Sequence, residues 1–315
     1  MNNYNTTIEK YQGALPKNKE YKFTKILKCG KIIDRLDMTW KPQAHIVREG
    51  GGIYLNKRTK ERKIMRGYEL NKETGEVEKM PKTDGNQMRN RRSLRKIFTD
   101  LRQLITTNYE GGESEVFLTL TYKEQHNDPK KIYADLNLFN VRLKRAYPAS
   151  GYLHIVEPHA SGNYHVHSLI KNMDYTPMLM TYEDAYKLWG HGYVTVEGLN
   201  NVDNIGAYFI AYFSNMEIAD EDLHKYKDDI KEMPRADGNG TKKVIKGARL
   251  DFYPDYMQIY RASRNLKKPE PIEEIDKKAH KKTYEAGYKL TYVDENGNTG
   301  ESYLRKEQWK NFSKS

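Results

Sequence analysis

The chain lacks most of the features that would place it outside a reducing, aqueous compartment. It has a single cysteine, Cys29, among 315 residues, so an internal disulfide is excluded and a reducing cytosol fits. No apolar run approaches the roughly 18 residues of a membrane-spanning helix, and the mean hydropathy is −0.93. Residues 1–22 are polar and lack the apolar segment of a signal peptide. We therefore expect a cytoplasmic protein with no membrane partner.

Acidic residues are too few to balance the basic ones. The chain has 54 lysines and arginines against 43 aspartates and glutamates, which gives a net charge of +11. Such a balance favours a polyanionic partner, either nucleic acid or an anionic membrane surface. Simple solubility would explain the same charge, so the net charge alone does not choose between these interpretations.

One short segment combines two histidines with a glutamate. His165 and His167 flank one apolar residue, and Glu157 lies eight positions before His165. Both flanks have strand character, so we predict a β-hairpin with its loop over residues 158–164. Side chains alternate along a strand, and in this register Glu157 lies opposite His165 while Ile155 lies opposite His167. The three polar side chains would then converge as metal ligands; the alternative is two half-exposed strand histidines that bind nothing.

A second candidate element is a predicted helix over residues 204–215. It carries Tyr208 and Tyr212, four residues apart, and positions with this spacing share one helix face. A tyrosine hydroxyl can act as a nucleophile when a metal or a base activates it. Beside a metal site the pair is therefore a candidate for catalysis; otherwise both are packing residues on an aromatic-rich helix.

The middle of the chain predicts alternating strands and helices. The expected order is a helix over residues 93–108, a strand over 116–122, a helix that begins at Asp128, the hairpin, a helix over 181–189, a strand over 193–197 and the tyrosine helix. This order predicts an α+β fold with a central antiparallel sheet flanked by helices and the hairpin at its centre. Basic side chains near the first helix either contact phosphate or form a solvated face.

The segments on either side of this core are expected to be smaller. We divide the chain into a basic N-terminal arm with a small accessory region (residues 1–85), a core (86–268) and a C-terminal hairpin extension (269–315). Within these, we expect a flexible arm over residues 1–21, a linker or exposed excursion over 217–241, a strand over 256–261 and a final turn near Asn296 and Gly297.

Three motifs, in this order, resemble those of rolling-circle replication initiators of the HUH endonuclease superfamily. Residues 117–122 resemble the first motif, a strand beneath the site. Residues 157–167 resemble the second, including the glutamate ligand of many viral and plasmid members. Residues 208–212 resemble the third, in which tyrosines on a helix are nucleophiles. The resemblance covers roughly residues 89–268 and is closest to initiators of plasmids, phages and integrative elements in Gram-positive bacteria.

The resemblance implies a metal-dependent, site-specific DNA endonuclease and strand transferase. His165, His167 and Glu157 would hold Mg²⁺ or Mn²⁺, whereas a mixed nitrogen and oxygen site taken alone would also accept Zn²⁺. Tyr208 would make the first cut, with Tyr212 as its partner, leaving a 5′-phosphotyrosine and a 3′-OH that primes rolling-circle replication. Many members carry a lysine one turn after the tyrosine, where this chain has Ala211 and Asn215, so that lysine's role is unassigned.

The implied partners are single-stranded or hairpin origin DNA, a host polymerase and a host helicase, inside a bacterial cell. A host helicase is needed because the chain has no P-loop motif. The competing interpretations are an HUH transposase, a relaxase and a non-enzymatic DNA-binding regulator. Relaxases usually have a third histidine where this chain offers Glu157. A covalent protein–DNA adduct would separate the enzymes from the regulator.

Overall fold

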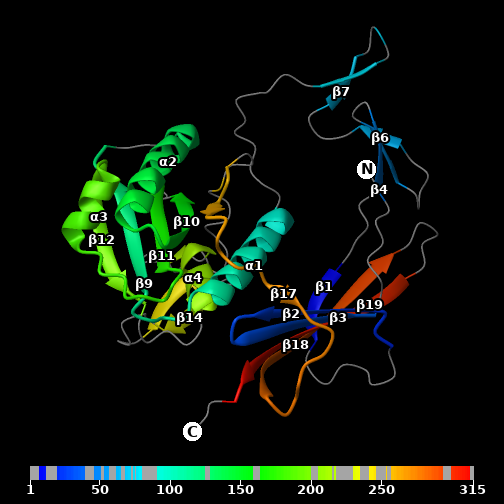
Figure 1. Cartoon of the computed structure of the whole chain (residues 1–315). Helices are drawn as coiled ribbons and strands as arrows, with labels where there is room; N and C mark the ends of the chain where they lie inside the picture. Colours follow the sequence, from blue (N-terminus) through cyan, green and yellow to red (C-terminus); the bar gives the residue numbers. More distant parts are fainter. Residues whose placement is uncertain are drawn as a thin grey trace. The chain divides into compact units, whose positions relative to one another are not determined.

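The protein is described by a computed structural model (Figure 1). The structure describes residues 7–11, 20–39, 46–50, 53–56, 62–64, 68–71, 74, 76–79, 91–124, 128–158, 164–199, 205–214, 216–217, 230–234, 241–245, 253, 257–293 and 299–312. The chain forms two compact units, which are residues 1–27, 32–85 and 271–315, and residues 28–31 and 86–270. Each unit is considered by itself.

The second unit is built on a five-stranded antiparallel sheet with the strand order β12-β9-β11-β10-β16. Its strands are β9 (Glu115–Tyr122), β10 (Ser150–Pro158), β11 (Tyr164–Asn172), β12 (Gly192–Gly198) and β16 (Tyr260–Ala262). Its helices are α1 (Arg91–Asn108), α2 (Pro129–Ala146), α3 (Tyr182–Trp189) and α4 (Ile205–Ser214). The predicted α+β fold is confirmed, and the hairpin β10–β11 lies at the centre of the sheet.

Helices α2 and α3 cover one face of this sheet. The even-numbered residues of β9 point toward them, so Leu118, Leu120 and Tyr122 are buried. The Tyr122 ring meets Trp189 of α3 edge-on at 4.9 Å between centroids. The Tyr122 hydroxyl donates to Asp135 Oδ2 of α2 at 2.9 Å. We call this side the helix-covered face.

Helices α1 and α4 pack against each other and belong to the same hydrophobic core. A Cβ atom added to Gly206 of α4 would meet Thr106 Oγ1 and lie 2.7 Å from the Arg102 carbonyl oxygen, both on α1. Glycine is therefore required at this crossing, because any side chain would separate the helices. Phe209 of α4 touches Phe117 of β9, with 4.7 Å between ring centroids. Helix α4 is thus held over the odd-numbered face of β9.

The predicted helix ends of this unit are confirmed. Asp128 is the N-cap of α2, and its Oδ1 accepts from the Lys130 backbone N–H at 2.9 Å. Helix α3 begins with a capping box between Thr181 and Asp184. It ends at Gly190, whose φ of 70° is the left-handed conformation that glycine adopts without strain.

A buried ion pair fastens the far end of the sheet to the end of α1. Lys171 Nζ lies 3.0 Å from Glu115 Oε1, and both residues are 5% exposed. The same ammonium donates to the Asn108 carbonyl at 2.9 Å, while Glu115 Oε2 accepts from the Gly111 backbone N–H at 2.9 Å. The hydrogen bonds to both partners offset the cost of burying two charges.

The first unit contains a six-stranded sheet made from both ends of the chain, in the order β1-β18-β19-β3-β2-β17. These strands are β1 (Thr7–Tyr11), β2 (Phe23–Cys29), β3 (Ile32–Met38), β17 (Glu270–Pro271), β18 (His280–Val293) and β19 (Thr299–Asn311). The buried Asp37 carboxylate holds it together by accepting from Arg305 Nη2 at 2.6 Å and Thr24 Oγ1 at 2.7 Å. The N-terminal and C-terminal regions, which the sequence treats separately, therefore contribute strands to one sheet.

Three local predictions are corrected by the structure. The expected flexible arm contains β1, which pairs along its length with β18. The expected linker contains part of a three-stranded sheet of β13 (Met216–Glu217), β14 (Ile230–Pro234) and β15 (Thr241–Ile245). The expected strand over residues 256–261 is reduced to β16, while the buried Ile259 accepts one hydrogen bond from Val156. The C-terminal hairpin is confirmed and is longer than predicted, and its turn lies outside the described residues.

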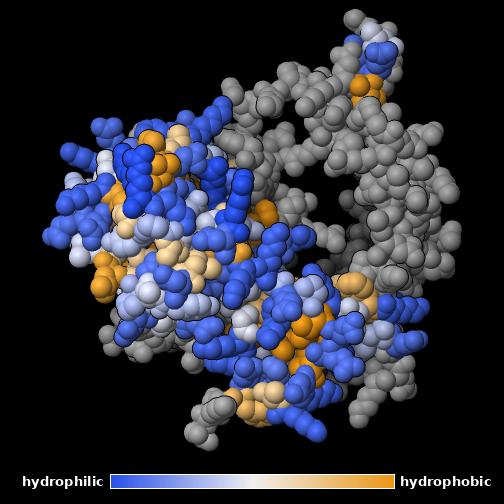
Figure 2. Space-filling model, in the orientation of Figure 1, coloured by the Kyte–Doolittle hydropathy of each residue, from blue (hydrophilic) through white to orange (hydrophobic). Residues whose placement is uncertain are grey.

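The remaining short strands are β4 (Ile46–Gly50), β5 (Ile53–Asn56) and β6 (Arg62–Ile64) in one sheet, and β7 (Tyr68–Leu70) with β8 (Val77–Lys79) in another. On the side shown in Figure 2, apolar residues appear as small groups among hydrophilic ones. Among the helices that the structure describes, none is long and apolar enough to cross a membrane.

Candidate functional site

The predicted register of the central hairpin is confirmed. Glu157 lies opposite His165, and Ile155 lies opposite His167. Each strand is one residue longer than expected, because Pro158 also pairs with Tyr164. The connecting loop is therefore residues 159–163, which lie outside the described part of the chain. The three predicted ligands share one face of the sheet, opposite the helix-covered face; we call it the site face.

The register continues across two further strands and sets up two rows on the site face. The first row consists of Glu157 on β10, His165 on β11, Thr121 on β9 and Tyr193 on β12. The second row consists of Ile155, His167, Thr119 and Thr195 on the same four strands. Directly paired residues have Cβ atoms about 4.5–5.5 Å apart, so each row is a line of neighbouring side chains.

Glu157 and His167 make the closest contact of the site. Glu157 Oε2 lies 2.5 Å from His167 Nε2, and the residues are 4% and 1% exposed. Burial lowers the pKa of His167 to about 3, with an opposing effect from the Glu197 carboxylate. The imidazole is therefore neutral at physiological pH. Its Nε2–H donates to Glu157, and its Nδ1 accepts from the Thr119 hydroxyl at 3.2 Å.

The chemistry of these donors fits a divalent cation, because neutral imidazoles and a carboxylate are ordinary ligands for such ions. The geometry fits in part. Glu157 and His167 converge, whereas His165 lies on the same face in the adjacent row and is half-buried. Among the residues that the structure describes, no three His, Cys, Asp or Glu side chains are grouped closely enough to form a metal site. A three-ligand site would need the His165 side chain to move toward the other two.

Two residues of the site were not predicted. Thr119 supports His167 from β9, and Phe117 stacks on the same imidazole with 5.6 Å between centroids and an interplanar angle of 6°. Phe117 also contacts Phe209, so one continuous chain of rings links His167 to α4. Both missed residues occupy alternate positions of β9. Extending the hairpin register to that strand would have identified them.

The predicted tyrosine helix is confirmed as α4, with Tyr208 and Tyr212 in its middle and last turn. The side chains of both tyrosines lie outside the described residues. Three tyrosines of the central strands, Tyr122, Tyr152 and Tyr164, are at even-numbered positions and belong to the helix-covered face. Burial and the hydrogen bond to Asp135 raise the pKa of Tyr122 above its ordinary range. These three are therefore poor candidates for the nucleophile.

His154 is also turned away from the site, as predicted. It is fully buried on the helix-covered face, where its Nε2–H donates to Asn140 Oδ1 at 2.7 Å and its Nδ1 accepts from Ser168 Oγ at 2.8 Å. Burial, reinforced by the positive charge of Arg261, lowers the pKa of His154 to about 3. We assign it a structural role.

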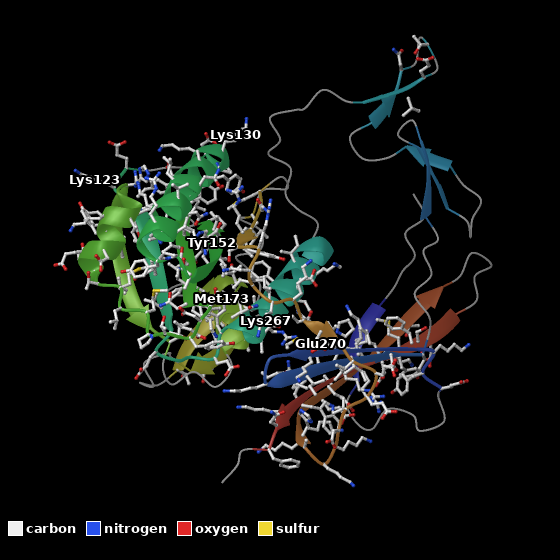
Figure 3. The ribbon with its side chains drawn as sticks, in the orientation of Figure 1. Lys123, Lys130, Tyr152, Met173, Lys267 and Glu270 are labelled. Atoms are coloured by element: carbon white, nitrogen blue, oxygen red, sulfur yellow. The ribbon has the colours of Figure 1, made fainter. Side chains whose placement is uncertain are left out.

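Exposed basic residues lie at the end of the sheet that bears the first row. Lys123 follows β9 directly, and Lys130 is in the first turn of α2. Figure 3 shows both at the same end of the unit, whereas Met173, which follows β11, lies toward the opposite end. Positive charge near the first row suits an anionic ligand.

Comparison with known proteins gives one match. Residues 115–217, about a third of the chain, match the family model of the replication-associated protein ORF2. The matched segment begins with β9 and includes the hairpin β10–β11, β12 and α4, so it contains every strand and helix described above as part of the site. No curated protein and no solved structure matches. The match supports a role in replication initiation.

Proposed function

We propose that this protein is a rolling-circle replication initiator that nicks single-stranded or hairpin origin DNA through a tyrosine on α4. The main support is the contact between His167 and Glu157 on the site face, within a segment similar to replication-associated proteins. A second support is the ring chain from His167 through Phe117 to Phe209, because it couples the tyrosine helix to the histidine strand.

In the proposed reaction Tyr208 is the nucleophile for the first cut. Its oxygen attacks the phosphorus as the bond from phosphorus to O3′ breaks; the tyrosine loses a proton and O3′ gains one. The products are a 5′-phosphotyrosine and a free 3′-OH. The phosphoester is exchanged rather than hydrolysed, so a second attack on the phosphotyrosine can rejoin strands. Tyr212, one turn further along α4, is the candidate for that second exchange.

Glu157, His165 and His167 would hold a divalent ion, Mg²⁺ or Mn²⁺, over the site face. When bound, such an ion neutralises charge on the non-bridging oxygens of the phosphate. His167 would present Nε2 as the ligand and donate from Nδ1–H to the Thr119 hydroxyl, which is the reverse of its present hydrogen bond. A threonine hydroxyl can both donate and accept, so it supports either tautomer.

The test is the detection of a covalent adduct on a denaturing gel. The full chain would be incubated with Mn²⁺ and a labelled single-stranded oligonucleotide library that includes the element's own origin. Tyr208→Phe, Tyr212→Phe and His165→Ala are compared with Tyr186→Phe, a control at an exposed residue on α3. We expect a metal-dependent adduct that Tyr208→Phe and His165→Ala abolish and Tyr186→Phe retains.

Other outcomes identify the competing functions. Tight DNA binding without an adduct would favour a non-enzymatic regulator and overturn the proposal. An adduct formed only at element ends would indicate a transposase. An adduct that survives the loss of both α4 tyrosines would place the nucleophile elsewhere, and mapping the modified peptide would then identify it.

A further inference from the structure

We infer that Tyr193 is a stacking platform for a base of the single-stranded DNA that the site binds. This inference rests on the proposed function, because it states where the DNA substrate lies. Tyr193 is on β12, the edge strand of the sheet, and is 63% exposed. It occupies the first row together with His165 and Glu157. An exposed aromatic ring is thus aligned with the predicted ligands by the hydrogen-bond register of four strands.

The alternation along β12 fixes the side on which the ring lies. Val194 and Val196 pack into the core beneath α3, so Tyr193 and Thr195 are directed to the site face. Two strand spacings separate Tyr193 from His165, which is about 10 Å. A nucleotide chain that places a phosphate at the histidines can therefore place a neighbouring base on the tyrosine.

The surface between the ring and the histidines is low and polar. Thr121 is the residue between Tyr193 and His165 in the first row, and Thr195 and Thr119 occupy the next row. Their short side chains leave room above the sheet, and their hydroxyls can donate to phosphate oxygens. An aromatic ring beside a polar groove is the combination that binds single strands without sequence preference, because every base has a face that can stack.

Charge indicates which part of the sheet the strand crosses. Lys123 is exposed and adjoins the first row, since its backbone N–H donates to the His191 carbonyl, two residues before Tyr193. Glu197, also exposed, pairs with Phe117 one row beyond Thr195. A polyanion is attracted to the first position and repelled by the second. The DNA path therefore follows the first two rows at the lysine end of the sheet.

Other aromatic residues of this unit fit the role less well. Tyr260 is on the site face at the other edge, but it is half-buried, with Lys96 and Asp100 of α1 close enough to affect its pKa. Tyr182 and Tyr186 are exposed and stack on each other at 6.0 Å. They lie on α3, which covers the opposite face. Tyr186 is therefore a matched control of similar exposure.

The test measures DNA binding separately from cleavage. The full chain is titrated into a fluorescein-labelled oligo-dT in EDTA, and binding is followed by fluorescence anisotropy. We expect Tyr193→Ala to weaken binding by about 5- to 150-fold, the loss that corresponds to one base stack. Tyr193→Phe and Tyr193→Trp should bind like the wild type, because each keeps a ring, and Tyr186→Ala should also be unchanged. An oligonucleotide with 5-iododeoxyuridine should photo-crosslink to Tyr193.

Failure of this inference differs from failure of the proposed function. Wild-type affinity in Tyr193→Ala, or equal weakening in Tyr193→Ala and Tyr193→Phe, would overturn the platform. Loss of the covalent adduct in Tyr193→Phe with unchanged binding would also overturn it, because Tyr193 would then be the attacking residue. Binding that depends on the Tyr193 ring without any adduct in the wild type would support the platform and contradict the nicking function.

Discussion

Thr119 Oγ1 lies 3.2 Å from His167 Nδ1, directly across the pair of strands β9 and β11. The contact fixes the ring from behind while Nε2 faces Glu157. A histidine that ligates a metal normally donates its other N–H to such a partner, which sets both its tautomer and its orientation. The first motif strand therefore supplies the outer support of the proposed metal site as well as the floor of the sheet.

Replacing Thr119 by valine tests this support, because valine keeps the shape and removes the hydroxyl. We expect Thr119→Val to reduce metal affinity or metal-dependent adduct formation by about 10- to 100-fold. Thr119→Ser should stay close to the wild type. The measurement is the Mn²⁺ concentration that gives half-maximal adduct. An unchanged Mn²⁺ requirement in the valine variant would show that the hydroxyl does not support a ligand.

The hairpin could be predicted from the sequence because its information is local. Alternation and loop length alone place Glu157 opposite His165, and the structure has that register. The contact between Thr119 and His167 joins residues 48 positions apart. It depends on which strand lies beside β11, and the pattern of one strand does not reveal its neighbour. For the same reason the α+β order could be predicted, whereas the Phe117 and Thr119 contacts could not.

Strands whose partners are distant escaped prediction most completely. β1 is polar and short, and it pairs with β18, more than 260 residues later in the sequence. Residues 217–241 are rich in charge and interrupted by proline and glycine, which suggests a linker, yet they contribute to a small sheet. In both cases pairing to a remote strand outweighs a weak local preference.

The buried pair of Lys171 and Glu115 should be required for stability. Lys171→Met would leave the Glu115 carboxylate buried without its counter-ion, which costs about 3–5 kcal/mol of unfolding free energy. The double variant Lys171→Met/Glu115→Gln should lose less, because the glutamine oxygen can still accept from the Glu110 and Gly111 N–H groups. Urea unfolding of both single variants and the double variant measures this. Strictly additive losses would contradict the coupling.

His154 predicts a pH dependence of stability. Its pKa is about 3 in the folded protein and 6.5 in its ordinary state, so between these values the unfolded chain binds a proton that the folded chain excludes. Its contribution is therefore complete above pH 6.5 and declines as the pH falls. Between pH 6 and 4, His154→Gln should flatten the loss by about 1.4 kcal/mol per pH unit. Urea unfolding across this range measures the slope, and identical slopes would contradict the assignment.

Gly206 should matter more for catalysis than for stability. In Gly206→Ala the new methyl group would meet Thr106 and the Arg102 carbonyl of α1, so α4 must shift and move its tyrosines relative to the histidines. Overpacking of this kind costs about 1–3 kcal/mol. Ala207→Gly, at the exposed neighbouring position, is the control, because it costs about 1 kcal/mol of helix propensity without a clash. With both variants fully folded at the assay temperature, we expect Gly206→Ala to lose most of its adduct formation and Ala207→Gly to retain it. Equal activity in the two variants would mean that the position of α4 over the site face is not critical, and it would weaken the assignment of the nucleophile to this helix.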